Sequence, residues 1–286
     1  MTNESDFPAY NFDAVVLPEQ SRGSLPAGAA RVSLHTADGV YPAVTWLPPL
    51  SLRQSDGCVI TGRAFACEIA SESEQRQLVL TRLDRHFQGN ALAHVATTAC
   101  PLDGEVDAVR LLVSQVQSAP IRAFIEEAFS DPQAFLWFWT CPASLAHHHA
   151  QAGGLARHSL HVAERAGFAV GDQPMQRDFA IAYGLLHDYG KVWAYDEGHL
   201  TPMAQRLGHE QIGYEKLLPA LLRLRDAWPD GGLVMQSLLS GQWKRDGKAP
   251  IQAVGNVVRS LDQFSAESDI TRRRDKSQKW RPVLVT

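Results

Sequence analysis

Two runs of sequence decide the fold: HHHAQAGGLARHSL at residues 147–160 and LLHDYGK at residues 185–191. The first run places His158 shortly after a Gly-Gly turn, and the second places His187 and Asp188 side by side behind two leucines. Apolar residues recur around both runs at helical spacing, which predicts helices over about Leu155–Gly167 and Arg177–Val192. These helices would carry ionisable side chains into an apolar core, which is costly unless a cation compensates them.

A metal ion is the compensation that these residue types favour. Imidazole nitrogens and carboxylate oxygens are ligands for Mn, Fe, Zn and Ni, and a carboxylate can bridge two ions. A further carboxylate, Asp262, lies in a later helix. A lone buried histidine is more commonly a hydrogen-bonded core residue. The combination of His158, His187, Asp188 and Asp262 instead favours one shared metal site.

The triple histidine at residues 147–149 is a second polar feature beside this site. Three successive side chains cannot all point one way, so we expect one or two of them to face the metal, with His148 and His149 preferred over His147. A histidine there would replace a missing ligand, donate to a phosphate, or act as a general acid, because imidazole titrates near working pH. The alternative is an exposed polar turn.

The chain before these runs has a different pattern. Residues 1–29 are rich in Pro, Ser, Gly and acidic side chains and have no sustained period, so we predict an irregular arm. Residues 30–100 alternate apolar and polar positions between turn signals, which predicts a small β-barrel or curled sheet. The expected strands are Arg31–His35, Tyr41–Leu47, Cys58–Ile69, Gln77–Leu83 and Ala91–Thr98.

Helical spacing dominates from residue 105 to about residue 271, so the predicted fold class is α+β with a mainly helical second domain. Asp131 before Pro132 is typical of a helix start. The aromatic residues Phe135, Trp137, Phe138 and Trp139 favour core packing over base stacking. Helices are expected at about 105–117, 119–130, 132–140, 155–167, 177–192, 209–225, 232–239 and 250–271.

Composition narrows the class of protein further. The chain has 286 residues, 45% of them hydrophobic, and a net charge of -4, so any polyanion binding must come from a local patch. No stretch reaches the roughly 18 apolar residues of a membrane span, and the N-terminus lacks signal-peptide features, so we expect a cytoplasmic protein. The four cysteines have no C-x-x-C spacing, which favours free thiols: Cys58, Cys67, Cys100 and Cys141.

Several motifs together resemble the HD-domain metal-dependent phosphohydrolases. Two branches of that superfamily are most similar: bacterial 3'-to-5' exoribonucleases that join an N-terminal OB-fold to an HD domain, and HD-type relaxases of conjugative elements. The resemblance implies an OB-like character for the β domain. The motifs are Pro142-Ala143-Ser144, His147-His148-His149-Ala150, Gly153-Gly154-Leu155, Arg157-His158-Ser159-Leu160 and Leu185-Leu186-His187-Asp188-x-Gly190-Lys191.

The resemblance also implies roles for particular residues. His158, His187, Asp188 and Asp262 would be the metal ligands, Lys191 would steady a phosphate, and His209 would belong to a second metal position. The exonuclease pattern has a histidine near the end of the next helix, where this chain reads LLSGQW at residues 238–243, so one or two ions remain as alternatives. Manganese is the favoured cofactor, with Fe, Ni, Zn and Mg as alternatives.

A basic tail completes the pattern at residues 272–286. Its cations would bind phosphates next to a phosphodiester-cleaving site, although such ends are commonly solvated and idle. The predicted function is a metal-dependent phosphodiesterase acting on single-stranded RNA or DNA, 3'-to-5' exonuclease-like, with hydroxide delivered in line to phosphorus. The alternatives are relaxase-type nicking, nucleotide hydrolysis, and a catalytically reduced nucleic-acid-binding protein. The candidate nucleic-acid-binding residues are Arg272, Arg273, Arg274, Lys276 and Lys279.

Overall fold

The computed structural model describes residues 8–19, 25–53, 57–70, 76–86, 89–145, 150–171, 173–196, 198–246 and 251–277. Its contacts divide the chain into two compact units. The first contains residues 1–99 together with residues 129–135, and the second contains residues 100–128 and 136–286. The predicted α+β class is confirmed, because the first unit is a β-barrel and the second is helical.

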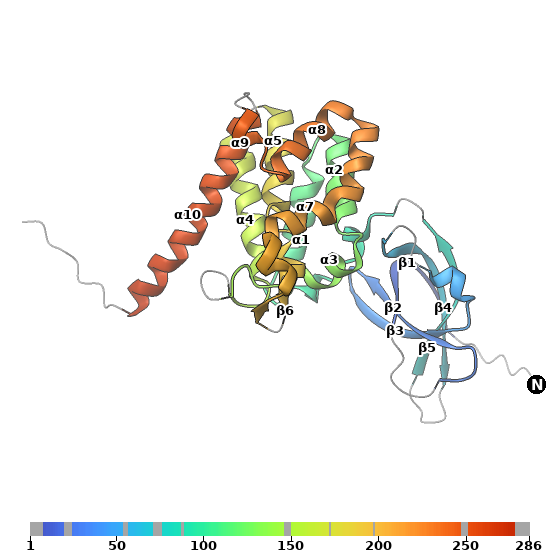
Figure 1. Cartoon of the computed structure of the whole chain (residues 1–286). Coiled ribbons are helices and arrows are strands. Elements are labelled where there is room, and N and C mark those ends of the chain that lie inside the picture. Colours follow the sequence, from blue (N-terminus) through green and yellow to red (C-terminus); the bar gives the residue numbers. More distant parts are fainter. Residues whose placement is uncertain are drawn as a thin grey trace, which may run out of the picture. The chain divides into compact units, whose positions relative to one another are not determined.

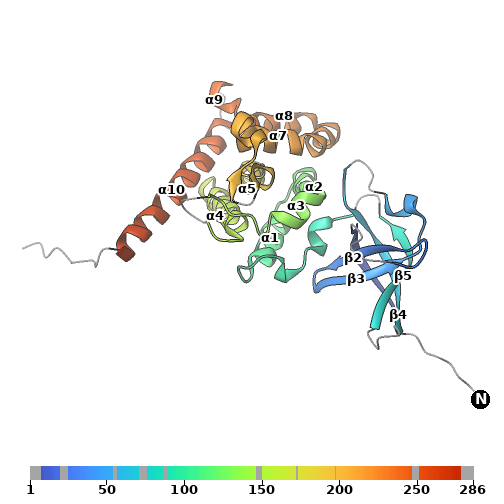
Figure 2. The ribbon, with the colours of Figure 1, turned by 60° about the horizontal axis from the view of Figure 1, so that its bottom comes forward.

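The first unit is a closed five-stranded barrel with the order β1-β2-β3-β5-β4 (Figures 1 and 2). β1 pairs antiparallel with both β2 and β4, and β3 pairs with β5 in parallel. The strands therefore close into one five-stranded barrel. The strands are β1 Ala9–Pro18, β2 Ala30–Thr36, β3 Gly39–Thr45, β4 Ile60–Ala70 and β5 Arg76–Arg85.

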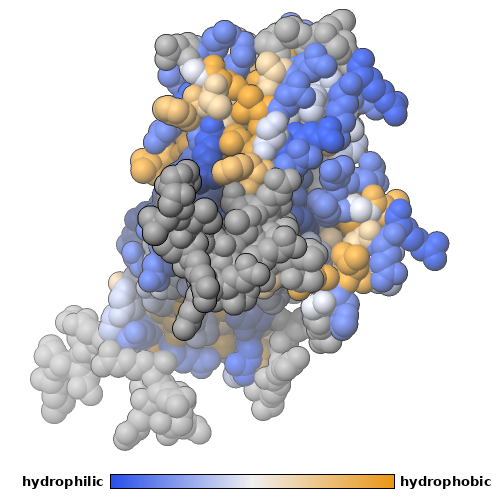
Figure 3. All heavy atoms as spheres, turned by 90° about the vertical axis from the view of Figure 1, so that its left-hand side faces the viewer, coloured by the Kyte–Doolittle hydropathy of each residue, from blue (hydrophilic) through white to orange (hydrophobic). Residues whose placement is uncertain are grey.

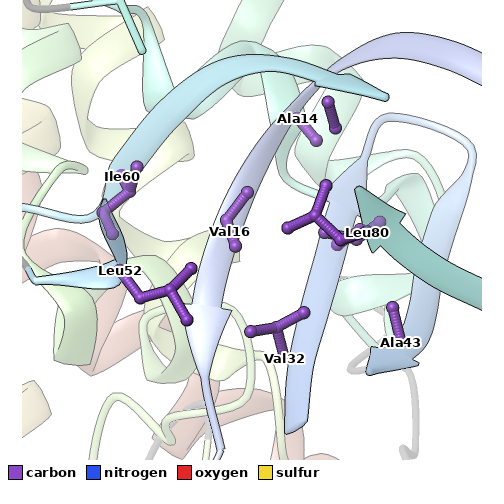
Figure 4. Packing of buried hydrophobic residues seen from close by; sticks show 9 residues of the cluster. Ala14, Val16, Val32, Ala43, Leu52, Ile60 and Leu80 are labelled. Carbon is purple, nitrogen blue, oxygen red and sulfur yellow. The ribbon is translucent and has the colours of Figure 1, made fainter. Parts of the chain in front are cut away.

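Alternate residues of each strand point into the barrel and fill it. Val16, Val32 and Leu80 lie inside and meet Leu52, which comes from the 3-10 helix η1, Pro49–Leu52, between β3 and β4 (Figure 4). Each fully buried valine or leucine contributes roughly 1.5–3 kcal/mol relative to an exposed position. The barrel therefore has a hydrophobic core of its own.

Two predictions about this unit were wrong. The predicted irregular arm contains β1, whose residues 14–17 are all buried, because one side faces the barrel interior and the strand also contacts η2, Ala91–His94. Burial on both sides removes the alternating pattern by which a strand is normally detected. Conversely, the predicted strand Ala91–Thr98 is two short 3-10 turns, since the Asn90 side chain caps the first of them by accepting the Ala93 N–H.

The second unit is built from helices, and most of them lie where the sequence predicts. The predicted helix Arg177–Val192 is interrupted, because the chain turns at residues 187–190 before a short helix begins at Lys191. The elements are α1 Glu105–Ser114, α2 Ala119–Ala128, α3 Pro132–Trp137, α4 Gly154–Ala169, α5 Pro174–Leu186, α6 Lys191–Ala194, β6 Tyr195–Asp196, β7 His199–Leu200, α7 Pro202–Ala227, α8 Pro229–Leu239, α9 Trp243–Asp246 and α10 Ile251–Ser277.

Three helices of this unit, α4, α5 and α10, bring distant parts of the chain together. α4 and α5 pack closely, because Gly184 has no side chain: a Cβ there would lie 2.7 Å from the Ala163 Cα. α10 packs against both of them, as the views in Figures 1 and 2 agree. It continues to Ser277, past the predicted end near residue 271, so the basic tail begins as helix. The face on this side of the molecule is a mosaic of hydrophilic and hydrophobic side chains (Figure 3).

Two smaller predictions are also decided. Phe135, Phe138 and Trp139 are buried, which confirms core packing, whereas Trp137 is 55% exposed. None of the four cysteines is in a disulfide, which agrees with the expected thiols. Among the described residues, no helix is both long and apolar enough to cross a membrane.

Candidate metal centre

The four predicted ligands meet at one point in the helical unit. His158 comes from the second turn of α4, His187 and Asp188 from the turn that ends α5, and Asp262 from the middle of α10. One ligand atom from each lies within 4.8 Å of the others. His158 and Asp188 are buried and Asp262 is 40% exposed, so the cluster opens to solvent on the α10 side.

The separations between these atoms fit a single cation. His158 Nε2 lies 3.1 Å from Asp262 Oδ1 and 3.4 Å from Asp188 Oδ2, and His187 Nε2 lies 3.4 Å from the same Asp188 oxygen. Ligands about 2.1 Å from a shared ion in tetrahedral or octahedral geometry stand about 3.0–3.4 Å apart along each edge. The residues present therefore fit a divalent metal ion, and nitrogen with carboxylate oxygen suits a borderline transition metal.

Hydrogen bonds behind the cluster turn both imidazoles inward. His187 Nδ1 lies 2.7 Å from the Gly184 carbonyl oxygen, and His158 Nδ1 lies 3.3 Å from Ser265 Oγ. A ring nitrogen that donates outward leaves the opposite Nε2 lone pair for a metal. Both Nε2 atoms face the two carboxylates, which is the orientation that a metal site requires.

The electrostatics of the cluster show how strongly it attracts positive charge. Burial lowers the pKa of His187, but the carboxylates of Asp188 and Asp262 outweigh it and raise that pKa to about 10. Burial raises the pKa of Asp188, but His187 and Lys191 hold it well below the usual range. Burial likewise raises the pKa of Asp262, while hydrogen bonds from His158 and His187 lower it below normal. Both carboxylates therefore stay ionised, as metal ligands must.

Lys191 and His209 both contact the Asp188 carboxylate, each at a different oxygen. Lys191 Nζ lies 2.6 Å from Oδ2, and His209 Nε2 lies 3.1 Å from Oδ1. His209 follows a kink at Gly208, where the backbone of α7 is left-handed with φ 76°. Within the described part of the chain, the four-residue cluster is the one group of three or more such donors, and it does not include His209, whose role at a second metal position stays a prediction.

The other predicted site residues lie beyond what the structure describes. His148 and His149 fall in residues 146–149, and Lys279 falls in residues 278–286, all outside the described residues. Arg272, Arg273, Arg274 and Lys276 lie on the last turns of α10, where the structure describes the backbone alone. Their predicted roles stay predictions.

Sequence reasoning missed residues whose contribution is close packing or support. Gly190 and Gly213 cross backbone to backbone, since a Cβ on Gly213 would lie 2.9 Å from Gly190 N, and this contact brings α7 and His209 to Asp188. Gly184 likewise allows α5 to pack closely on α4, because a Cβ at this position would meet main-chain atoms of Ala163. Cys141 lies beside Lys191, with Sγ 3.6 Å from its carbonyl oxygen, and burial raises the pKa of its thiol to about 12.

A comparison with protein-family models identifies the domain that holds the cluster. The model of the HD domain family matches residues 155–267, a span that begins in α4, ends in α10 and contains all four clustered ligands. Residues 155–267 are an HD domain. Searches of curated proteins and of solved structures each found no match.

The HD domain explains the chemistry of the cluster. With its His/Asp set complete, residues 155–267 form an HD metal-dependent phosphohydrolase domain, and a five-stranded β-barrel precedes it in the chain. The match covers neither the barrel nor the basic end of α10, and it singles out neither the exoribonuclease branch nor the relaxase branch. The substrate of the HD domain therefore has to be argued from the rest of the chain.

Proposed function

We propose that the chain is a phosphodiesterase that cleaves single-stranded nucleic acid, with 3'-to-5' exonucleolytic action and manganese as the preferred ion. The observation that carries the proposal is the closed five-stranded barrel, with the order β1-β2-β3-β5-β4, on the same chain as the HD centre. We interpret this barrel as an OB-fold, a five-stranded Greek-key barrel. OB-folds bind oligonucleotides across the face of their second and third strands. A free nucleotide offers such a barrel no extended strand to bind.

The surface of the barrel supports a ligand with stacked bases. Tyr41 on β3 and Trp46, which directly follows β3, are 43% and 48% exposed. On β4 and β5, the Arg82 guanidinium lies 4.1 Å from the Phe65 ring centre. Exposed aromatic rings and stacked arginines bind bases without sequence preference, at roughly 1–3 kcal/mol for each stacked base.

The residues of the HD centre have separable tasks in cleaving a phosphodiester. His158, His187, Asp188 and Asp262 would hold a divalent ion, which would lower the pKa of a bound water and neutralise charge on the phosphate oxygens. Asp188 accepts from Lys191 and faces both imidazoles, so it fixes the position of its partners. Lys191 is buried and cationic, and its pKa is raised because the Asp188 carboxylate outweighs burial. We assign it to steady a non-bridging phosphate oxygen.

The exposed edge of the centre is where a strand would enter. Asp262 and His209 are the two most solvent-exposed groups around Asp188, at 40% and 37%. From Asp262, α10 continues to Ser277 and carries the basic residues, which begin ten positions later. At 1.5 Å per residue this is about 15 Å along the helix axis, a distance that several nucleotides of a single strand can span.

Cleavage of end-labelled polymers tests the proposal. Metal-reconstituted protein is incubated with 5'-labelled RNA and DNA, single- and double-stranded, and Asp188→Asn serves as the matched inactive control. A ladder that shortens from the 3' end of single strands is expected. A single discrete cut would instead indicate the relaxase-type alternative. Hydrolysis of free nucleotides with every polymer left intact would overturn the proposal.

A further inference from the structure

Helix α10 carries a polar residue where its packing pattern calls for an apolar one. Val254 and Val258 are buried at 2% and 1%, and the same stripe continues through the half-buried Leu261 to Ser265, which is 9% exposed. Positions spaced by three and four residues face the core of a helical domain and are normally filled by apolar side chains. A serine at this position buries less apolar surface than a valine or leucine would, so we expect its hydroxyl to make a specific contact.

The hydroxyl meets the imidazole that α10 already contacts through Asp262. Ser265 Oγ lies 3.3 Å from His158 Nδ1, and Asp262 Oδ1 lies 3.1 Å from His158 Nε2. Residues three apart on a helix share a face, so one helix reaches both nitrogens of a fully buried ring. The docking of α10 therefore delivers a metal ligand and an orienting group to His158 together.

The second imidazole of the centre is oriented by different means. His187 Nδ1 lies 2.7 Å from the carbonyl oxygen of Gly184, one turn earlier in the same chain segment. That partner belongs to the main chain and is present whatever side chains surround it. For His158, the described structure places a side chain from another helix at Nδ1. The partner at Nδ1 of His158 is therefore a side chain, which a substitution can change.

We propose that Ser265 is a positioning residue for the metal centre: its hydroxyl oxygen accepts the Nδ1–H of His158 and so keeps the Nε2 lone pair directed at the metal. Partners that fix the tautomer and ring orientation of a histidine ligand typically change metal affinity by about 10–100-fold when they are removed. Serine is a neutral acceptor, so we expect the lower end of that range. The inference concerns the HD centre itself and holds for any phosphoester substrate.

Three substitutions at one position separate orientation from packing. Ser265→Ala removes the acceptor, Ser265→Thr keeps the hydroxyl, and Ser265→Cys keeps the shape but offers only a weak acceptor. The matched control is Ser260→Ala, on an exposed position of the same helix. The probes are Mn²⁺ and Zn²⁺ titrated by calorimetry into metal-free protein, with the thermal midpoint of each metal-free variant measured alongside.

We expect Ser265→Ala to bind Mn²⁺ about tenfold more weakly, Ser265→Thr to restore most of the affinity, and Ser265→Cys to fall between them. Turnover of bis(p-nitrophenyl) phosphate by Ser265→Ala should recover as Mn²⁺ is raised, because the loss lies in metal binding. The proposal is overturned if Ser265→Ala binds metal like wild type, or if Ser265→Thr is as weak as Ser265→Ala. Affinity losses that merely track the thermal midpoints across the three variants would also refute it.

Discussion

A substitution at Gly190 tests how close packing assembles the metal centre. The backbone conformation at this position is open to any residue, but the neighbouring atoms leave no room for a side chain. Its φ of -65° and ψ of -13° are ordinary helical values, so alanine brings no backbone strain. A Cβ at this position would collide with the carbonyl oxygen of His209 and with the main-chain nitrogen of Gly213. Neither atom belongs to a flexible side chain. Non-bonded atoms need about 3.5 Å, so Gly190→Ala must push α7 back by more than about 1 Å.

The cost of this displacement comes from overpacking and from the loss of one contact. Forcing an extra methyl into a packed core typically costs 1–3 kcal/mol, and we expect about 3 kcal/mol here because the obstacles are main-chain atoms. For a unit of this size that lowers the thermal midpoint by about 6–12 °C. His209 Nε2 would also leave Asp188 Oδ1, from which it now lies 3.1 Å, so Mn²⁺ affinity should fall about tenfold.

Thermal unfolding followed by circular dichroism and Mn²⁺ titration by calorimetry provide the assay, with two controls from the same chain. Gly213→Ala meets Gly190 N at 2.9 Å and should lose less than Gly190→Ala does. Gly39→Ala in the barrel meets nothing closer than 3.8 Å and should stay within about 0.5 kcal/mol of wild type. The reasoning fails if Gly190→Ala melts like wild type, or if Gly213→Ala proves the more harmful of the two.

Three further outcomes are expected. Asp188→Asn should abolish turnover of bis(p-nitrophenyl) phosphate and lower the bound metal measured by mass spectrometry, with helix content by circular dichroism unchanged; undiminished turnover would remove the metal mechanism. Deleting residues 272–286 should weaken binding to long single strands and reduce the slope of log K against log salt by roughly 0.7 per lost phosphate contact; an unaltered slope would make this end idle. His35 is buried, and burial lowers its pKa to about 4. The unfolded chain therefore binds a proton at this residue more readily than the folded chain does, so the free energy of unfolding decreases as the pH falls below the ordinary histidine pKa. Between pH 7 and 5 the loss should be about 2 kcal/mol, and urea unfolding of His35→Gln should lack this component; an identical pH dependence in the variant would contradict it.

The fold was predictable where burial affects one face of an element and unpredictable where it affects both. β2 to β5 and α4 show the expected periods, and their positions agree with the structure within a few residues, whereas α7 begins at Pro202, before the predicted start at residue 209. β1 escaped prediction because Ala14, Val15, Val16 and Leu17 are all buried, which leaves no alternation. The error at Ala91–Thr98 has the opposite cause, since an apolar run there packs as short 3-10 turns started by the Asn90 cap.

The candidate ligands were predictable because their chemistry conflicts with their setting. An ionisable His187–Asp188 pair behind two leucines is costly to bury without a partner, so residue type and position together indicate a site. The residues that hold the site together by close packing show no such mismatch between residue type and surroundings. Gly184 and Gly213 act by lacking a side chain, and the main-chain atoms they approach come from elements far apart in the sequence. Ser265 did leave a signal, a hydroxyl on the apolar stripe of α10, but its partner is 107 positions away.

Helix α10 completes the metal centre by supplying Asp262. The charges around Asp262 affect how firmly α10 is held. α10 brings a second carboxylate to a buried one: Asp262 arrives opposite Asp188, and the mutual repulsion of these anions opposes docking. Val254 and Val258 supply apolar contact that favours docking, while Lys191 and His187 supply positive charge. A divalent ion held by the four ligands would add to that balance. At a hundred times its dissociation constant, an ion that binds only the docked state stabilises that state by about 2.7 kcal/mol. Metal binding and the docking of α10 would therefore be linked, and the basic residues near the C-terminal end of α10 belong to the same helix.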